Sequence, residues 1–414
     1  MKRLLAAALT AALTLTLVGC GNRTDDEYYV EESHVEQPLP TAAPTEEEAI
    51  PTVSSRNELR GTVLSFIRNW TERGVIAVQD YDGDLSTDLS EILSYATQED
   101  PIGAYAVDYA DAELSGDGQE GSIALSLVFR RSAAEISSIV TVNDIAAAKT
   151  KIQQALTAYD TALTLRIRSY TEADFAADVR QYCLEHPDQI VAIPELSAEL
   201  YPNEGTTRIL ELHFSYPDTR DELQRKLASV QTILLSASSY VSSGRTDHDR
   251  AALLFRFLTT RFDYTVRETE PAMPAYDLLC EGVAHSLSFA AVFRAECVAA
   301  GMECWLVSGT LNGQSHAWNL LRLEDNWYYV DLMRSVLLEE AELRLLTPEE
   351  AANAGYAWDT SEYPTEAAPQ ELLPTQPTEA APQESTVPTE VPSTEAPTTV
   401  PPTETETQAP TEGQ

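Results

Sequence analysis

The spacing of apolar residues between 56 and 217 predicts two successive units of helices and strands. In the first unit, residues 56–134, apolar side chains recur at helical spacing on one face: Leu59, Val63, Phe66, Ile67 and Trp70. A short strand, a second helix and a hairpin follow, with strands expected over 75–78, 104–114 and 122–129. The predicted element order is α-β-α-β-β.

The second unit, residues 135–217, has the same predicted order of elements. Helices are expected over 144–163 and 173–185, and strands over 164–169, 196–200 and 208–214. The pattern Leu125-x-Leu127-x-Phe129 recurs 85 residues later as Leu210-x-Leu212-x-Phe214. We interpret this recurrence as an internal duplication. The alternative is that unrelated α+β units share such patterns.

The third region, residues 218–355, adds further helices and strands, so the fold class is α+β. Helices are predicted over 218–242 and 247–261, and another begins near Ser286 and stops at Gly301. Strands are predicted over 304–310, 316–323 and 327–332. The helix starts with a polar residue, one strand opens with His316 and the next closes with Asp331. Such residues are the ingredients of a nucleophile, base and orienter site.

The segment 275–331 resembles the core of the transglutaminase-like superfamily, which has a papain-like fold. The similarity rests on an EG loop, an HAWN motif that contains His316, and a WYYVD motif that ends at Asp331. It extends over about residues 245–335 and implies that His316 is the catalytic base and Asp331 its orienter. The family's cysteine nucleophile would lie fifteen residues before Gly301, and Ser286 occupies that position.

The serine at this position leaves two interpretations of function open. A cysteine at a helix N-terminus is partly thiolate near neutral pH, whereas a serine hydroxyl needs full general-base help. The leading interpretation is a degenerate, non-catalytic site in which Ser286 is only a helix N-cap. The alternative is an active Ser286-His316-Asp331 hydrolase or acyl transferase on amide bonds, protease-like or transglutaminase-like. For the neighbouring His285, we favour a neutral substitution over an improvised base.

The remaining cysteines offer no clear replacement for the nucleophile. Cys297 and Cys304 are expected to be small buried hydrophobic residues, and Cys280 lies in the loop that approaches Ser286. Together with Cys183 they make four cysteines outside the leader sequence. This number permits disulfides without specifying their pairing.

The first twenty residues have the features of a bacterial lipoprotein signal peptide. Lys2 and Arg3 precede an apolar stretch, and Leu17-Val18-Gly19-Cys20 resembles a lipobox. We therefore expect Cys20 to be lipidated, and the protein to be held by this anchor at the extracytoplasmic face of the cell membrane. An ordinary signal peptide is the alternative.

Residues 21–55 and 356–414 are predicted to be disordered. The first segment is an acidic, proline-bearing linker, and the second is a tail rich in proline, threonine and glutamate. Neither has a periodic pattern of apolar residues that could form a core.

Composition narrows the classes of partner. The chain has 66 acidic and 27 basic residues and a formal net charge of −39, which disfavours nucleic acid. Alternating acids at Asp80, Asp82 and Asp84 lack the closing glutamate of a calcium loop, and we expect no metal or cofactor. The sequence thus predicts a surface lipoprotein that binds a peptide, a protein or a cell-wall component.

Overall fold

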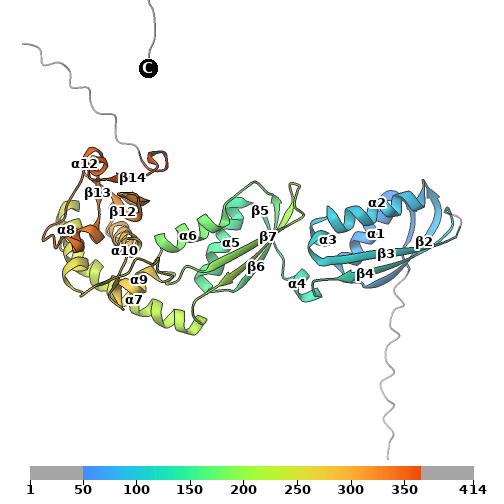
Figure 1. Cartoon of the computed structure of the whole chain (residues 1–414). Coiled ribbons are helices and arrows are strands. Elements are labelled where there is room, and N and C mark those ends of the chain that lie inside the picture. Colours follow the sequence, from blue (N-terminus) through green and yellow to red (C-terminus); the bar gives the residue numbers. More distant parts are fainter. Residues whose placement is uncertain (1–49, 117, 365–414) are drawn as a thin grey trace, which may run out of the picture. The chain divides into compact units, whose positions relative to one another are not determined.

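The computed structural model describes residues 50–116 and 118–364, which form two compact units, one ending at Ser137 and the other beginning at Ser138 (Figure 1). The predicted signal peptide with Cys20, the linker up to residue 49 and the tail from residue 365 lie outside the described residues. Lipidation and disorder therefore stay predictions. Among the helices that are described, none is long and apolar enough to span a bilayer.

The first unit is a four-stranded sheet with helices packed against it. Its elements are β1 (Thr52–Ser55), α1 (Arg56–Arg68), β2 (Arg73–Asp82), α2 (Leu85–Gln98), α3 (Pro101–Ala106), β3 (Val107–Gly116), β4 (Gly121–Phe129) and α4 (Ala133–Ser137). The strand order is β1-β2-β4-β3, in which β1 and β2 are parallel and the other pairs are antiparallel. Leu59 and Ile67 of α1 and Ile92 of α2 are fully buried in its core.

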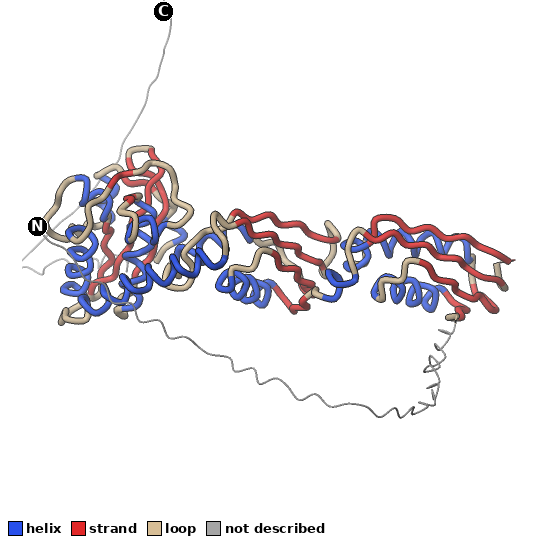
Figure 2. The backbone as a smooth tube through the Cα atoms, turned by 90° about the horizontal axis from the view of Figure 1, so that it is seen from below, coloured by secondary structure: helices blue, strands red, loops and turns tan. Residues whose placement is uncertain are grey.

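The compact unit that begins at Ser138 starts with a domain of the same topology as the first unit. It consists of β5 (Val140–Asp144), α5 (Ile145–Ala158), β6 (Ala162–Ser169), α6 (Phe175–Glu185), β7 (Glu195–Tyr201) and β8 (Arg208–Ser215). The strand order β5-β6-β8-β7 repeats the pattern of the first sheet, including one parallel pair at β5 and β6. Figure 2 shows helices lying against the strands of this domain. The shared topology agrees with the mixed α+β fold class, and a duplication in the sequence stays a prediction.

Two details of these domains differ from the sequence-based expectation. A parallel strand, β1 or β5, precedes the first helix of each domain, so the predicted linker to residue 55 ends too late. Each of these strands buries a single side chain, Val53 or Val142, which is too few to produce a visible alternation. The first part of the predicted strand 104–114 is helical, because Asp100 caps α3 and Pro101 occupies its first turn.

The C-terminal domain places one buried helix against an antiparallel sheet. Its elements are α7 (Arg220–Val241), α8 (Asp247–Thr260), β9 (Thr265–Val266), α9 (Pro274–Leu279), β10 (Val283–Ala284), α10 (Ser286–Ala299), β11 (Cys304–Leu311), β12 (Gln314–Leu323), β13 (Asn326–Val330), α11 (Leu332–Leu337), α12 (Pro348–Asn353), β14 (Tyr356–Ala357) and the 3-10 turn η1 (Thr360–Glu362). The strand order is β13-β12-β11-β14. Helix α10 packs on β11 and β12, and its first eight residues are all buried.

The sequence predicted that the C-terminal domain ends at residue 355, but the structure extends it beyond this residue. Strand β14 pairs with β11, where Thr310 lies opposite Ala357, and the hydroxyl of Tyr363 accepts a hydrogen bond from Ser308 N at 3.2 Å. The close approach requires Gly309, because a Cβ there would lie 2.3 Å from the carbonyl oxygen of Ala357. The last segment of the domain therefore completes the sheet next to the candidate site.

Candidate active site

Ser286 is the first residue of α10, and His285 is its N-cap. The predicted role of Ser286 as the N-cap is therefore wrong by one residue. The imidazole Nδ1 of His285 accepts a hydrogen bond from Leu287 N at 3.2 Å, which satisfies one of the free N–H groups at the helix start. Ser286 itself is 6% exposed.

His316 and Asp331 form a buried pair, fifteen residues apart in the sequence. His316 lies on β12, and Asp331 follows β13 and caps α11. His316 Nε2 is 2.7 Å from Asp331 Oδ2, and the two side chains are 13% and 5% exposed. Because a carboxylate only accepts hydrogen bonds, the Nε2–H of His316 donates, and the Nδ1 of a neutral ring is left as an acceptor.

Asp331 is held by two further hydrogen bonds. The hydroxyl of Tyr356 donates to Asp331 Oδ2 at 2.7 Å, and Arg334 N donates to Oδ1 at 2.9 Å. Burial, followed by the adjacent Asp331 carboxylate, raises the pKa of Tyr356, so its hydroxyl stays protonated and donates. Sequence reasoning missed Tyr356, since it lies just beyond the predicted end of the domain.

The serine Oγ is hydrogen-bonded to the backbone of β12. Ser286 Oγ accepts a hydrogen bond from Ala317 N at 3.2 Å, and within the described part of the chain it makes no hydrogen bond to His316. The fold thus brings all three predicted residues to one place, but it links only His316 and Asp331 directly. A serine protease triad requires a hydrogen bond between the hydroxyl and the imidazole as well.

His285 does not supply a second base. Its Nδ1 lone pair is already occupied by Leu287 N. Burial is the largest influence on its pKa and lowers it, while the Glu270 carboxylate and the carbonyl of Glu268 act in the opposite direction. The ring is therefore held as a neutral cap.

The described cysteines, all four of them free, do not provide an activated thiolate. Burial raises the pKa of Cys183 to about 12 and that of Cys297 well above its ordinary value. Cys280 is exposed, but partial desolvation of its sulfur raises its pKa, and the nearby Glu281 carboxylate raises it further. Cys304 is buried on β11. Reactive cysteines require the opposite shift.

The second α+β domain covers the start of α10. Leu184 of α6 packs in one apolar cluster with Leu287, Ala290 and Ala291 of α10 and with Ala317 of β12. An ion pair between Arg180 of α6 and Glu270 links the same helix to the loop before α9. The side chains next to Ser286 and His316 are therefore packed against another domain.

Metal-binding groups are not assembled in the described residues, where no three His, Cys, Asp or Glu side chains gather into a metal site. Asp84, from the acidic stretch at 80–84, caps α2 by accepting from Thr87 N at 3.1 Å. This local role accounts for one of the three alternating acids.

Comparison with known proteins identifies the class of the C-terminal domain. Residues 236–332 match the model of the Transglutaminase-like superfamily, so the chain contains a transglutaminase-like domain. The match includes Ser286, His316 and Asp331, and it confirms the resemblance seen in the sequence. No curated protein is significantly similar to the chain.

Three solved structures have low overall similarity to the chain. A protein described as a TGase is 11% identical, with a TM-score of 0.23, over 41% of this chain and 50% of that one. A putative cysteine protease from Cytophaga hutchinsonii is 16% identical, with a TM-score of 0.23, over 40% and 70%. The periplasmic domain of TgpA from Pseudomonas aeruginosa is 17% identical, with a TM-score of 0.22, over 35% and 64%. The chain spans about half the length of the first of these.

Proposed function

We propose that this protein is a cell-surface lipoprotein whose transglutaminase-like domain has lost its chemistry and binds peptides, proteins or cell-wall components. One observation carries the proposal. The hydroxyl at the nucleophile position accepts a hydrogen bond from Ala317 N, and within the described residues it makes no hydrogen bond to His316. Ser286 then links the start of α10 to β12 and acts as part of the framework.

The chemistry of oxygen and sulfur supports the same conclusion. A cysteine at this helix start would gain thiolate character from the helix dipole and the imidazole. A serine hydroxyl has no such ionised form near neutral pH and depends on correct alignment with the base. A misplacement of about 1 Å costs roughly a hundredfold in rate.

The alternative function is a serine-dependent hydrolase or acyl transferase on amide bonds. The observation in its favour is the buried pair between His316 Nε2 and Asp331 Oδ2 at 2.7 Å, which leaves Nδ1 as a potential base. We give this function second place, because the same pair also has a structural role through Tyr356 and the start of α11.

The excess of acidic residues in the chain favours cationic peptides as ligands. Glu270, which is half-exposed and ion-paired with Arg180, acts electrostatically on His285 next to Ser286. The chain as a whole carries a formal net charge of −39. Lysine-containing peptides from the cell envelope match this charge.

Binding of labelled lysine-containing stem peptides to the full chain, measured by fluorescence anisotropy, tests the proposal. We expect saturable binding that Glu270→Gln weakens about three- to tenfold, since the substitution removes a carboxylate and leaves the Arg180 guanidinium unpaired beside the site. Glu303→Gln, a half-exposed acid paired with Arg322 on the sheet, is the matched control and should leave binding unchanged. Absence of saturable binding would refute the binding function, and an acyl adduct on Ser286 in mass spectra would favour the hydrolase.

A further inference from the structure

A cavity lies along the C-terminal half of α10, whereas Ser286 is at the N-terminus of this helix. Its volume is about 500 Å³, within the range of small-molecule sites. Leu234 and Leu235 of α7 form one apolar wall, and Val298 and Ala299 of α10 form another. Leu235 is 70% exposed, so part of this apolar surface is open to solvent.

One buried carboxyl lies among these apolar walls. Glu296 is 3% exposed, and its Oε2 accepts a hydrogen bond from Ser238 Oγ at 2.8 Å. Its Oε1 has no hydrogen-bond partner in the described ranges. Since the fully inaccessible atoms that lack a partner there do not include Oε1, this oxygen has some access to solvent. Because Glu296 lines the cavity, this oxygen is available to a ligand there.

The other charged groups at the cavity leave an excess of negative charge. Arg294 is already neutralised, because its Nη2 lies 3.3 Å from Glu185 Oε1 and its Nη1 donates to the Glu185 carbonyl at 3.1 Å. Asp188 lines the same cavity without forming an ion pair in the described residues. A buried carboxylate gains most from a cationic hydrogen-bond donor, and an anion would be repelled.

We propose that this cavity binds a small primary alkylammonium ion, with its chain along Leu234, Leu235 and Val298 and its ammonium group on Glu296. The apolar walls match the alkyl chain, and the free Oε1 accepts from the ammonium group. The inference does not depend on the function proposed for the Ser286 region, since the two sites share no residue.

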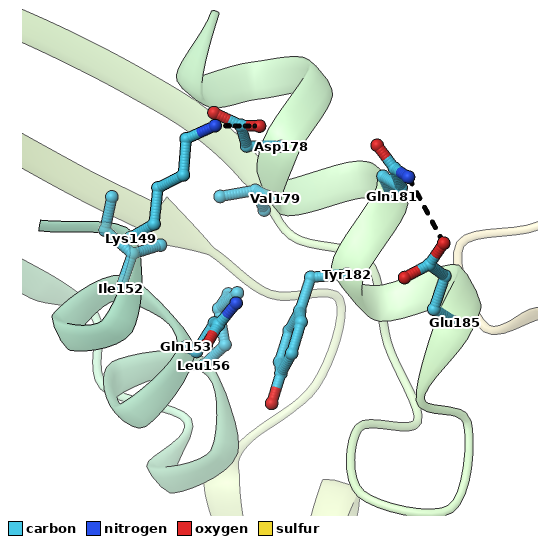
Figure 3. Close-up of a pocket in the computed structure, with 9 residues that line it drawn as sticks. All are labelled: Lys149, Ile152, Gln153, Leu156, Asp178, Val179, Gln181, Tyr182 and Glu185. Atoms are coloured by element: carbon cyan, nitrogen blue, oxygen red, sulfur yellow. Dashed lines mark hydrogen bonds and ion pairs between the residues drawn. The ribbon is translucent and has the colours of Figure 1, made fainter. Parts of the chain in front are cut away.

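The neighbouring cavity between α5 and α6 shows why a buried free carboxyl oxygen matters. It has a volume of about 160 Å³, and its charged side chains are each paired with a neighbouring side chain (Figure 3). Lys149 Nζ donates to Asp178 Oδ1 at 2.8 Å, and Gln181 Nε2 donates to Glu185 Oε1 at 3.2 Å. These pairs satisfy the groups that would otherwise hold a ligand.

Proton linkage gives the proposed site a signature in pH. Burial raises the pKa of Glu296 to about 7, the hydrogen bond from Ser238 opposes this shift, and Asp188 adds to it. An ammonium ion prefers the ionised carboxylate, so its affinity should increase about tenfold between pH 6 and pH 8. Glu185, His186 and Asp188 also face the cavity from the end of α6, and Arg294 faces it from α10. Because we assign the pH dependence of the affinity to Glu296, His186→Asn should leave that dependence unchanged.

Calorimetric titration of the full chain with n-hexylammonium chloride tests the inference, with hexan-1-ol as the uncharged probe. At pH 8 we expect the ammonium ion to bind roughly 10- to 100-fold more tightly than the alcohol. Glu296→Gln should reduce this difference to less than about threefold and remove the pH slope. Glu303→Gln changes an acid that does not line the cavity and should change neither.

A second variant keeps the test decisive if the buried substitution alters folding. Leu235→Lys changes a largely exposed side chain at the wall of the cavity and should weaken hexylammonium binding about tenfold by charge repulsion. Leu337→Lys, at an exposed position of α11, is its control. Equal affinity for the two probes, or full binding in both the Glu296→Gln and Leu235→Lys variants, would overturn the proposal.

Discussion

Asp331→Ala is expected to reduce the free energy of unfolding of the C-terminal domain by about 3–5 kcal/mol, even though we propose that the domain is not catalytic. Asp331 is 8% exposed and accepts hydrogen bonds from His316 Nε2, Tyr356 OH and Arg334 N. Alanine would leave these donors without their acceptor in a buried place and would remove the N-cap of α11. Urea denaturation of the full chain, followed by tryptophan fluorescence, measures the loss.

The controls separate this effect from a general effect of removing an acid. Asp325→Ala changes a side chain that is 99% exposed and should shift stability by less than about 0.5 kcal/mol. Asp331→Asn keeps an oxygen that can accept from Arg334 N and should cost less than alanine. If Asp331→Ala were as stable as the wild type, the His316–Asp331 pair would have no structural role, and its retention would instead favour the hydrolase.

Glu296→Gln is expected to stabilise the protein by about 3 kcal/mol at pH 8 and to have almost no effect at pH 4.5. Burial raises the pKa of Glu296 from 4.5 to about 7. Between these two values the folded protein holds a proton that the unfolded chain releases, so wild-type stability decreases as the pH rises. Above pH 7 the folded protein must keep a buried charge, whereas glutamine stays neutral and can still accept from Ser238 Oγ.

Denaturant unfolding of both proteins between pH 4 and pH 8.5 measures this difference. The gap between variant and wild type should open above pH 4.5 and become constant above pH 7. A gap that is independent of pH would show that Glu296 titrates normally in the folded protein. A destabilising carboxyl that lines a cavity is typical of a functional site, because binding energy can offset its cost.

The sequence predicted the elements around Ser286 well because their signals are local. The helix start and Gly301 bounded α10, and the aromatic and apolar alternation after Cys304 placed three strands to within about three residues. By contrast, β1 and β5 bury one side chain each, so their pairing depends on a neighbouring sheet that local patterns do not reveal.

The candidate site was predictable only in part. Motif spacing found His316 and Asp331, and counting from Gly301 found Ser286. The cap assignment failed because imidazole is an uncommon N-cap, so serine was the expected residue. Tyr356 could have been suspected from the aromatic residues of Tyr356-Ala357-Trp358, since no aromatic residue follows Tyr363 in the sequence. Its contact with Asp331 comes from tertiary packing and required the structure.

The packing of α6 against the start of α10 could not be predicted from the sequence either. Leu184 lies in the predicted helix 173–185, and nothing in the local sequence indicates which surface it packs on. The structure places it against Leu287 and Ala317, next to the candidate site at Ser286 and His316. Contacts between domains of this kind depend on the shapes of both surfaces.

The most direct test of the proposal that the transglutaminase-like domain has lost its catalytic activity is to measure turnover of amide bonds by the full chain. Hydrolysis and transamidation of a peptide panel would be measured for the wild type, His316→Ala and Ser286→Cys. We expect the wild type to have no turnover above the His316→Ala background, because Ser286 Oγ is held by Ala317 N and makes no hydrogen bond to the imidazole within the described residues. Activity confined to Ser286→Cys would show an intact cleft that lacks only its nucleophile. Wild-type turnover that His316→Ala abolishes would contradict the account and establish a serine-dependent enzyme.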